Sequence, residues 1–572
     1  MRKRAFTAMV MGMALVLATL APAAWAGQDL PAGLNPGAIE KSLQPRVGQT
    51  PSAAPEIRIG QDSTGKLQGG DGVEFKLTEI TFDGNQVFTD QELTQAVAPF
   101  IGLVIGVNDL AKVVDTVTNY YVSRGYILSR AYLPQQSIKD GKVIIAMVEG
   151  RLGAIYVKGN QRYKADLIRR VMDLIRKENA VTTESLERSL LLLNDYPGLS
   201  VKSTLVRGQE PGTTDIVVDV TEAKWWQAGF DYNNFGSEYV SPHRLGFSLT
   251  FLNPFGYGDR MSFRYMTGTN GGAEEGPLWY LRADYDFPVN RYGTRVGVAL
   301  SRLNYDLGQE LEILDIEGRS DLMSVWASHP IWRTRNLSLW ADAGFDFKRI
   351  QNKMFDELMY EEDLHNLRFG SHMEWIDGHS GQNLVTVNVT KGLSDDVIGS
   401  RLYADGNFLK GEASYRRVQA LPYNLTGLFS IFGQYSGARL PTAEEFSAGG
   451  AGTVRGWAMG DYSGDHGIVS TVEVRYPLLK TQLDWQAPSG SRGTWGLDAA
   501  LFSDYGRVWV KDPLAAEQSD AMLWGWGLGL RAAWAPYGMA KIDYARPLKG
   551  DKPLDEGLDE RGAWYLQLSL TY

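Results

Sequence analysis

From about residue 224 to the end of the 572-residue chain, apolar and polar side chains alternate in short segments separated by turn-forming residues. This period of two predicts β-strands with one apolar and one polar face. The last segment shows the pattern clearly, because one face is formed by Trp564, Leu566, Leu568, Leu570 and Tyr572. Its other face is formed by Tyr565, Gln567, Ser569 and Thr571. The pattern predicts an antiparallel all-β region over residues 224–572.

The faces of these segments suit a barrel in a membrane. Around residue 530, Arg531 shares a face with glycines, whereas tryptophan and leucine side chains form the other face. Beyond the amino terminus, no apolar stretch is long enough for a transmembrane helix. Only helices and closed barrels satisfy backbone hydrogen bonds in lipid, so a membrane-spanning form of this chain must be a barrel. Strands of about 9–11 residues predict about 14 to 18 of them, in an even number.

The amino terminus has the parts of a secretory signal peptide. Positive charges at positions 2–4 precede an apolar run over residues 8–20, and Ala24-Trp25-Ala26 fits the small-x-small cleavage pattern. We expect cleavage after Ala26, which assigns residues 1–26 to a signal peptide and places the mature chain beyond the inner membrane. The alternative is a single membrane anchor, for which the apolar run is short.

Composition excludes several kinds of site. The net charge of −10 argues against a nucleic-acid partner, since such proteins usually carry a basic stripe. Cysteine is absent, so a disulfide, a thiolate nucleophile or a cysteine-based metal site is impossible. The six histidines form no H-E-x-x-H motif. We therefore expect no cofactor, no metal site and no catalytic residues.

Residues 27–72 form a short helix and a linker in this interpretation. Residues 35–43 have an Asn cap and a proline in the first turn, which is typical of a helix start. Residues 45–72 are rich in Pro, Gly, Ser and Gln, a composition typical of linkers.

An internal repeat follows the linker. A strand-like segment runs into Gly84-Asn85, and a similar segment runs into Gly159-Asn160, 75 positions later. Helical patterns and then alternating segments follow each pair, which predicts the order β-α-α-β-β twice. The expected helices span residues 90–97, 110–124, 164–175 and 183–194, and expected closing strands include residues 143–148 and 215–220.

This repeated α+β layout resembles POTRA (polypeptide-transport-associated) domains. The resemblance covers about residues 75–223, and residues 190–199 resemble the second such unit of haemolysin- and adhesin-secreting proteins. We assign residues 73–150 to POTRA 1 and residues 151–223 to POTRA 2. The alternative is a pair of generic α+β modules that are unrelated to POTRA domains.

Two motifs in the barrel region carry a more specific resemblance. Residues 440–446 lead into Val454-Arg455-Gly456-Trp457, and a later segment reads Phe502-x-Asp504-x-Gly506. Together they resemble the loop and strand motifs of the TpsB and BamA superfamily. The resemblance implies a loop that folds back into the lumen, where Arg455 meets Asp504 on the wall. An arginine fork can clamp a carboxylate at two points, and Gly456 permits a turn that a Cβ would hinder.

The resemblance also implies an architecture and an activity. Two POTRA units rather than five favour the TpsB family of two-partner secretion transporters, which includes FhaC- and ShlB-like proteins, and a barrel of 16 strands. Such a protein lies in the bacterial outer membrane, with its POTRA units in the periplasm. It recognises an unfolded TpsA-type exoprotein and exports it without nucleotide hydrolysis. The amino-terminal helix of this family can plug the pore, although the shortness of residues 35–43 argues against a stable plug.

Further partners follow from the same resemblance. Outer-membrane lipids surround the barrel, and the barrel assembly machinery is expected to read Tyr572, because a final strand ending in an aromatic residue resembles its signal. The cargo could be an adhesin, a cytolysin or a contact-dependent toxin.

Three other functions remain as alternatives. An assembly factor that inserts other barrels would be expected to have five periplasmic repeats, and this chain has room for two. A lipid hydrolase within a barrel would need a nucleophile elbow, but Gly378-His379-Ser380-Gly381 does not match G-x-S-x-G. A passive porin or receptor would not explain the repeats.

Overall fold

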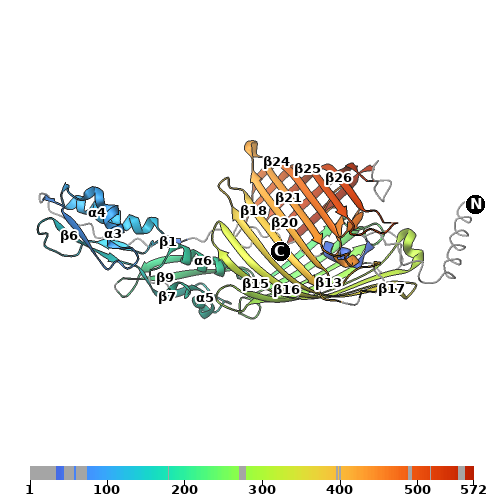
Figure 1. Cartoon of the computed structure of the whole chain (residues 1–572), viewed down its shortest axis with the longest axis horizontal. Coiled ribbons are helices and arrows are strands. Elements are labelled where there is room, and N and C mark those ends of the chain that lie inside the picture. Colours follow the sequence, from blue (N-terminus) through green and yellow to red (C-terminus); the bar gives the residue numbers. More distant parts are fainter. Residues whose placement is uncertain are drawn as a thin grey trace, which may run out of the picture.

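The structure is a computed structural model. It describes residues 34–43, 57–59 and 74–572, except 178–179, 211, 270–277, 395–396, 399–400, 487–491, 516 and 552–560. The predicted signal peptide and nearly all of the predicted linker lie outside the described residues. Two small α/β units extend from one side of a large barrel (Figure 1).

The first unit has a three-stranded sheet in the order β3-β6-β5, a short β2–β4 pair and two helices. Helix α3 begins with a capping box, in which the Thr89 backbone and hydroxyl both donate to the Glu92 carboxylate. These hydrogen bonds lower the pKa of Glu92. The elements are β2 (Phe75–Lys76), β3 (Glu79–Asp83), α3 (Asp90–Val97), β4 (Val104–Ile105), α4 (Val107–Ser123), β5 (Arg130–Tyr132) and β6 (Lys142–Val148).

The second unit has a four-stranded sheet in the order β1-β8-β9-β7, covered by two helices. Strand β1 comes from the linker region and pairs in parallel with β8. The elements are β1 (Ile57–Ile59), β7 (Arg151–Lys158), α5 (Ala165–Met172), α6 (Thr183–Asn194), β8 (Leu199–Arg207) and β9 (Thr213–Glu222).

The predicted helices of both units are present. Helices α3 and α6 have the predicted bounds, α4 begins three residues earlier than expected, and α5 ends at Met172. The predicted segments 143–148 and 215–220 lie in β6 and β9, which are interior strands of their sheets. Interior strands have both edges paired, so these two segments offer no free edge to another chain.

The carboxy-terminal region is a closed barrel of 16 antiparallel strands, with a further two-residue strand, β19 (Val397–Ile398), paired beside β17. Closure occurs where the last strand, β28, pairs with the first, β10. The predicted fold class and strand number are therefore confirmed. The strands are β10 (Trp226–Asn233), β11 (His243–Leu252), β12 (Arg260–Thr269), β13 (Trp279–Pro288), β14 (Arg295–Asp306), β15 (Ile316–Arg333), β16 (Leu337–Met354), β17 (Glu357–Ile376), β18 (Gln382–Gly392), β20 (Leu409–Ala420), β21 (Thr426–Ser436), β24 (His466–Gln486), β25 (Arg492–Trp509), β26 (Asp520–Ala535), β27 (Gly538–Gly550) and β28 (Ala563–Thr571).

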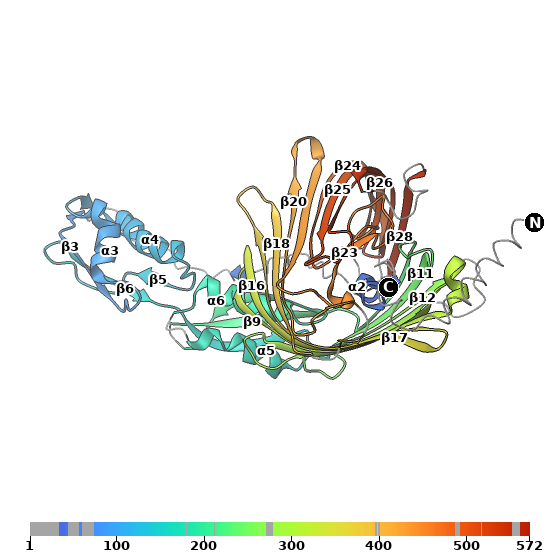
Figure 2. The same ribbon diagram turned by 45° about the vertical axis from the view of Figure 1, so that its right-hand side comes forward.

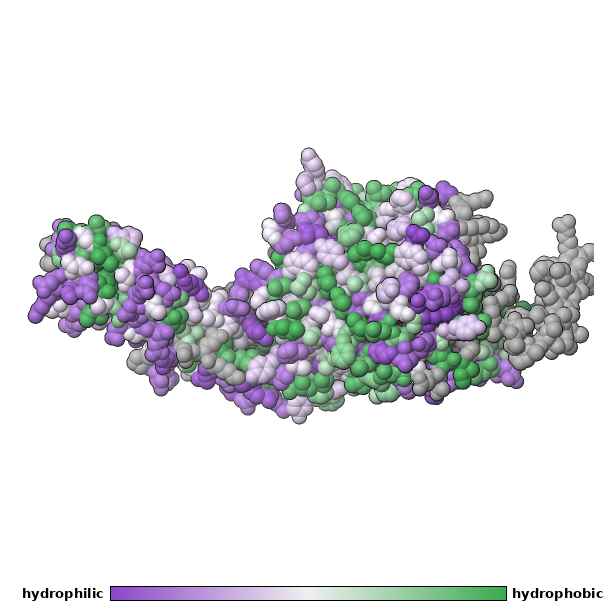
Figure 3. All heavy atoms as spheres, viewed as in Figure 1, coloured by the Kyte–Doolittle hydropathy of each residue, from purple (hydrophilic) through white to green (hydrophobic). Residues whose placement is uncertain are grey.

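The two faces of the barrel differ in polarity as the alternation predicted. Trp526, Leu528 and Leu530 of β26 are exposed on the outside, whereas Arg531 is buried. Green apolar patches cover much of the outer barrel surface in Figure 3. Within the described ranges, no helix is both long and apolar enough to cross a membrane.

The lumen contains two inserts from different parts of the chain. Helix α2 (Pro36–Leu43) lies inside the barrel and contacts β14, β15 and β16 (Figure 2). The long segment between β21 and β24 also enters the lumen, and its short strands β22 (Phe446–Ala448) and β23 (Tyr462–Gly464) pair with each other.

Candidate functional site

The tip of the β21–β24 loop carries the predicted Val454-Arg455-Gly456-Trp457 motif. Gly449 and Gly450 have φ values of +112° and +89°, a left-handed conformation that favours glycine and turns the chain at the end of β22. Arg455 is 5% exposed, so its charge is removed from bulk solvent. The loop therefore delivers a buried guanidinium to the barrel wall.

Asp504 of β25 receives this guanidinium in a two-point contact. Arg455 Nε lies 2.7 Å from Asp504 Oδ2, and Arg455 Nη2 lies 3.0 Å from Oδ1. The Arg455 backbone N–H also donates to Oδ2 at 3.2 Å. Asp504 is 1% exposed and, among the described residues, forms an ion pair with Arg455 alone.

The remaining donors of Arg455 reach two further carboxylates. Nη1 lies 2.9 Å from Asp543 on β27 and 3.3 Å from Glu473 on β24. Arg531 bridges the same two carboxylates from β26, at 2.5 Å and 2.9 Å. The loop tip is therefore tied to a charge network that spans four neighbouring strands.

The other motif residues shape the space around Arg455. The Arg455 guanidinium carbon lies 3.3 Å from the centre of the Phe502 ring, a cation–π contact. A Cβ on Gly506 would approach Val454 to 2.7 Å, so Gly506 makes room for that side chain. Gly456 has a φ of +98°, and its N–H donates to the Tyr565 hydroxyl at 3.0 Å.

Trp457 closes the motif inside an apolar cluster. It is 2% exposed and packs in one cluster with residues of β22, β24, β25 and β26. The Tyr565 hydroxyl donates to its carbonyl at 3.1 Å. The structure thus brings the predicted loop residues and wall residues into one site, while their functional roles stay predictions.

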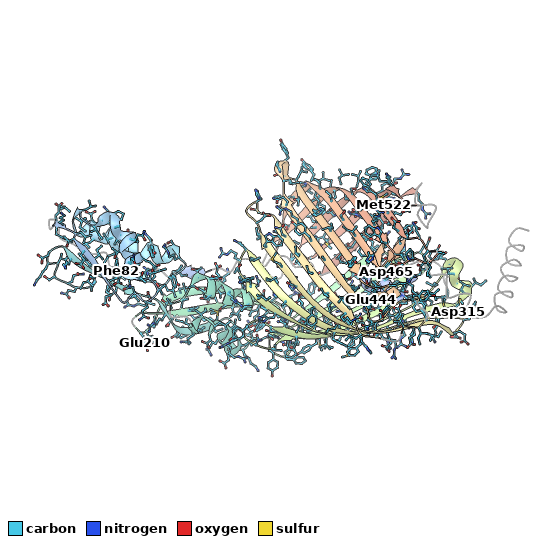
Figure 4. All side chains as sticks on the ribbon, viewed as in Figure 1. Phe82, Glu210, Asp315, Glu444, Asp465 and Met522 are labelled. Carbon is cyan, nitrogen blue, oxygen red and sulfur yellow. The ribbon has the colours of Figure 1, made fainter. Side chains whose placement is uncertain are left out.

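The base of the loop has a separate set of anchors. Glu444 is 2% exposed and lies 2.5 Å from Lys348 Nζ and 2.7 Å from Lys410 Nζ. Arg401 reaches Glu445 at 2.7 Å and Asp465 at 2.9 Å. Glu444 and Asp465, both labelled in Figure 4, lie within the barrel region. The loop is therefore held by ion pairs at its base as well as at its tip.

Helix α2 is anchored to the wall and to this loop base. Its Glu40 carboxylate accepts hydrogen bonds from the hydroxyls of Ser301 at 2.7 Å and Ser320 at 2.5 Å. Gly37 packs so closely that a Cβ there would lie 2.7 Å from the Ala443 Cβ. The helix occupies the lumen although it has only eight residues, so its shortness did not prevent lodging there.

One wall residue connects both inserts. Arg244 of β11 donates to Ser42 Oγ of the helix at 3.2 Å and to Met459 Sδ of the loop at 3.7 Å. The side chain is 2% exposed. Displacement of either insert would therefore change the surroundings of the same buried cation.

The second α/β unit is fixed to the mouth of the barrel. Arg333 of β15 lies 2.7 Å from Asp195 after α6, and Arg335 lies 2.7 Å from Glu187 within that helix. Arg162 donates to the Asn253 carbonyl at 3.2 Å. These contacts place the end of α6 beside the opening of the lumen.

Tyr572 lies at the seam where the barrel closes. Its backbone exchanges two hydrogen bonds with Ala228 of β10, and its ring lies 4.1 Å from Lys224 Nζ. The side chain is 59% exposed. Its predicted role as an assembly signal stays a prediction.

Sequence reasoning missed several members of the site. Asp543, Glu473 and Tyr565 contact Arg455 or its neighbours, but no short motif marks them. The alternation places Tyr565 on the face opposite the apolar one, which was the available signal. Helix α2 was identified, whereas its anchors on β14 and β15 depend on long-range packing.

Comparisons with known proteins agree with this architecture. The family model for haemolysin secretion/activation protein ShlB/FhaC/HecB matches residues 212–532, and the ShlB-type POTRA model matches residues 75–150. The heme/hemopexin transporter protein HuxB of Haemophilus influenzae is 24% identical over 531 residues, covering 90% of this chain and 91% of its own. The outer membrane transporter CdiB of Escherichia coli O6:K15:H31 is 25% identical over 488 residues, which cover 77% of this chain and 78% of CdiB.

Solved structures show the same fold. CdiB from Escherichia coli superposes with a TM-score of 0.69 at 21% identity, covering 89% of this chain and 92% of its own. BamA from Haemophilus ducreyi lacking POTRA domains 1–3 superposes with a TM-score of 0.51 at 14% identity. The match covers 87% of this chain and 100% of the BamA chain. The chain therefore belongs to the ShlB/FhaC/HecB family, the TpsB transporters of two-partner secretion, which lie in the bacterial outer membrane with their POTRA domains in the periplasm.

Proposed function

We propose that the periplasmic units recognise an unfolded TpsA-type exoprotein and that the barrel exports this protein to the cell surface or the medium. The observation that carries the proposal is the content of the lumen. A loop and a helix fill it, and both are held by polar contacts that can break without unfolding the barrel. A partner chain that displaced them would find a continuous path between the periplasm and the outside.

Export in this proposal needs no nucleotide. The sequence has no G-x-x-x-x-G-K-[ST] loop that would cradle phosphates. The exoprotein threads the lumen unfolded and folds outside, and its folding draws the remaining chain outward. Relatives carry names of haemolysin and heme/hemopexin transporters, and the proposal takes from them a secreted protein as cargo.

An extended exoprotein can bind by adding a strand to a sheet, since main-chain pairing tolerates varied sequence. The interior strands β6 and β9 cannot accept an added strand, because both of their edges are already paired. The outer edge of β8 is likewise occupied, by β1. The edge strands of the larger sheets are β3 and β5 in the first unit and β1 and β7 in the second. We propose β5 as a contact, because its Tyr132 is 49% exposed and lies on a strand with one unpaired edge.

Disulfide trapping tests this contact, and the absence of native cysteine makes single-cysteine variants unambiguous. We expect Tyr132→Cys to trap an exoprotein with single cysteines in its amino-terminal region severalfold more than Asp115→Cys, an exposed site on α4. The readout is the disulfide-linked product on a non-reducing gel. Trapping at Asp115→Cys that equals trapping at Tyr132→Cys would reject strand addition at β5.

A further inference from the structure

A cavity of about 800 Å³ lies where the second periplasmic unit meets the barrel. Its floor is formed by residues at the end of α6, including Leu192, Asp195 and Tyr196. Its walls come from strands β11, β12 and β14 to β18 on the side of the barrel that faces the second unit. A chain that passes from the second unit into the lumen would meet this cavity.

Most charged groups around the cavity already have partners. Arg333 is paired with Asp195, and both Arg260 and Arg295 are paired with Asp286. Three arginines are thereby matched by two carboxylates, which are held in short contacts.

The other wall carries two further acids, Asp342 with a partner and Glu374 without one among the described residues. Asp342 lies 2.7 Å from His372 Nδ1, and the His372 ring stacks on Trp340 at 4.5 Å between centroids. Glu374, two residues along β17, has no ion pair or hydrogen bond to any described residue. Its Oε1 atom is buried and has no hydrogen-bond partner. A carboxylate oxygen that is withdrawn from water without a donor is costly, so this position favours a ligand that donates to it.

Apolar and aromatic side chains line other parts of the same cavity. Trp326 lies over Gly297, where a Cβ would meet the indole at 2.5 Å, and it lines the cavity. Leu384 of β18 lies directly opposite Glu374 in the strand register, and Leu252 of β11 adds aliphatic surface elsewhere in the lining. The aliphatic stem of a lysine or arginine packs well on such a surface while its charged end binds a carboxylate. The face of an indole ring also attracts cations.

We propose that this cavity binds a basic side chain of the polypeptide in transit, with the Glu374 carboxylate accepting its charged end and Leu384, which lies opposite Glu374 on β18, packing on its stem. The inference rests on the proposed function, because the position of the cavity matters only if a chain enters there. It gives the transporter a preference for lysine or arginine at the step between the second periplasmic unit and the lumen.

Peptide binding to the purified full-length protein in detergent tests this assignment. The probes are two fluorescein-labelled extended nonapeptides that differ only in a central lysine or glutamine. Fluorescence anisotropy is expected to show about fivefold tighter binding of the lysine peptide, a difference on the order of 1 kcal/mol. Glu374→Gln is nearly isosteric and should abolish the preference while leaving binding of the glutamine peptide unchanged.

The matched control is Glu184→Gln, the same change at an exposed site on α6. It should retain the preference, and heat-modifiable migration on gels verifies that each barrel is folded. Equal affinities for both peptides in the wild type, or a preference that persists in Glu374→Gln, would overturn the inference. Export of the exoprotein by the wild-type chain is scored separately, so a failure of the proposed function remains distinct from a failure of this site.

Discussion

Arg455→Ala is expected to reduce export of the exoprotein by about tenfold or more at equal barrel abundance. The substitution leaves Asp504 buried, at 1% exposure, without its ion-pair partner. Removing one member of a buried pair costs about 3–5 kcal/mol. Since about 1.4 kcal/mol corresponds to a factor of ten, the loop tip would leave its position on the wall in a large share of molecules.

The measurement is the amount of exoprotein in the culture medium when both proteins are expressed together. Arg282→Ala is the matched control, because Arg282 also forms an ion pair in the barrel, with Asp284, but bonds to none of the described residues of the loop or of α2. Asp504→Asn should reduce export similarly, and the double variant should add little further loss. Normal export by Arg455→Ala would reject a role for the loop clamp and leave the transporter assignment intact.

Deletion of residues 34–43 is expected to raise the ion conductance of the pore severalfold. Helix α2 fills part of the lumen and is held there by Glu40 and by its packing on Ala443. Without it, water and ions gain that volume. Single-channel recordings in planar bilayers measure the change, and deletion of the equally long segment 62–71, which belongs to the predicted linker, is the control.

A pair of point variants refines this test. Gly37→Leu places a side chain where a Cβ already lies 2.7 Å from Ala443, so overpacking of about 1–3 kcal/mol should push the helix out and raise conductance. Ala38→Leu adds the same side chain at a half-buried position beside a cavity, and its conductance should stay near the wild-type value. Identical conductance for the deletion and the wild-type chain would show that α2 does not block the pore.

The barrel could be predicted because period-two alternation is a local property of the sequence. Apolar residues such as Leu528 and Leu530 did meet the outside, and Arg531 did face the lumen. The positions of helices α3 and α6 were also encoded locally, by a capping residue and by apolar spacing.

The parts that escaped prediction depend on contacts between distant segments. The interior positions of β6 and β9 follow from the order of strands in each sheet, which their own residues do not reveal. Asp543 and Glu473 meet Arg455 only because the four strands β24 to β27 lie side by side. The anchors of α2 on Ser301 and Ser320 likewise join residues more than 250 positions apart.

Transport into liposomes tests the central claim most directly. The purified full-length chain is reconstituted with its periplasmic units outward, and urea-unfolded exoprotein is added without nucleotide. We predict that the exoprotein becomes protected from external protease in vesicles that contain the wild-type chain, and that Arg455→Ala vesicles protect far less. Exoprotein that stays fully sensitive to protease, in vesicles whose conductance proves that the barrel is inserted, would contradict export through this barrel.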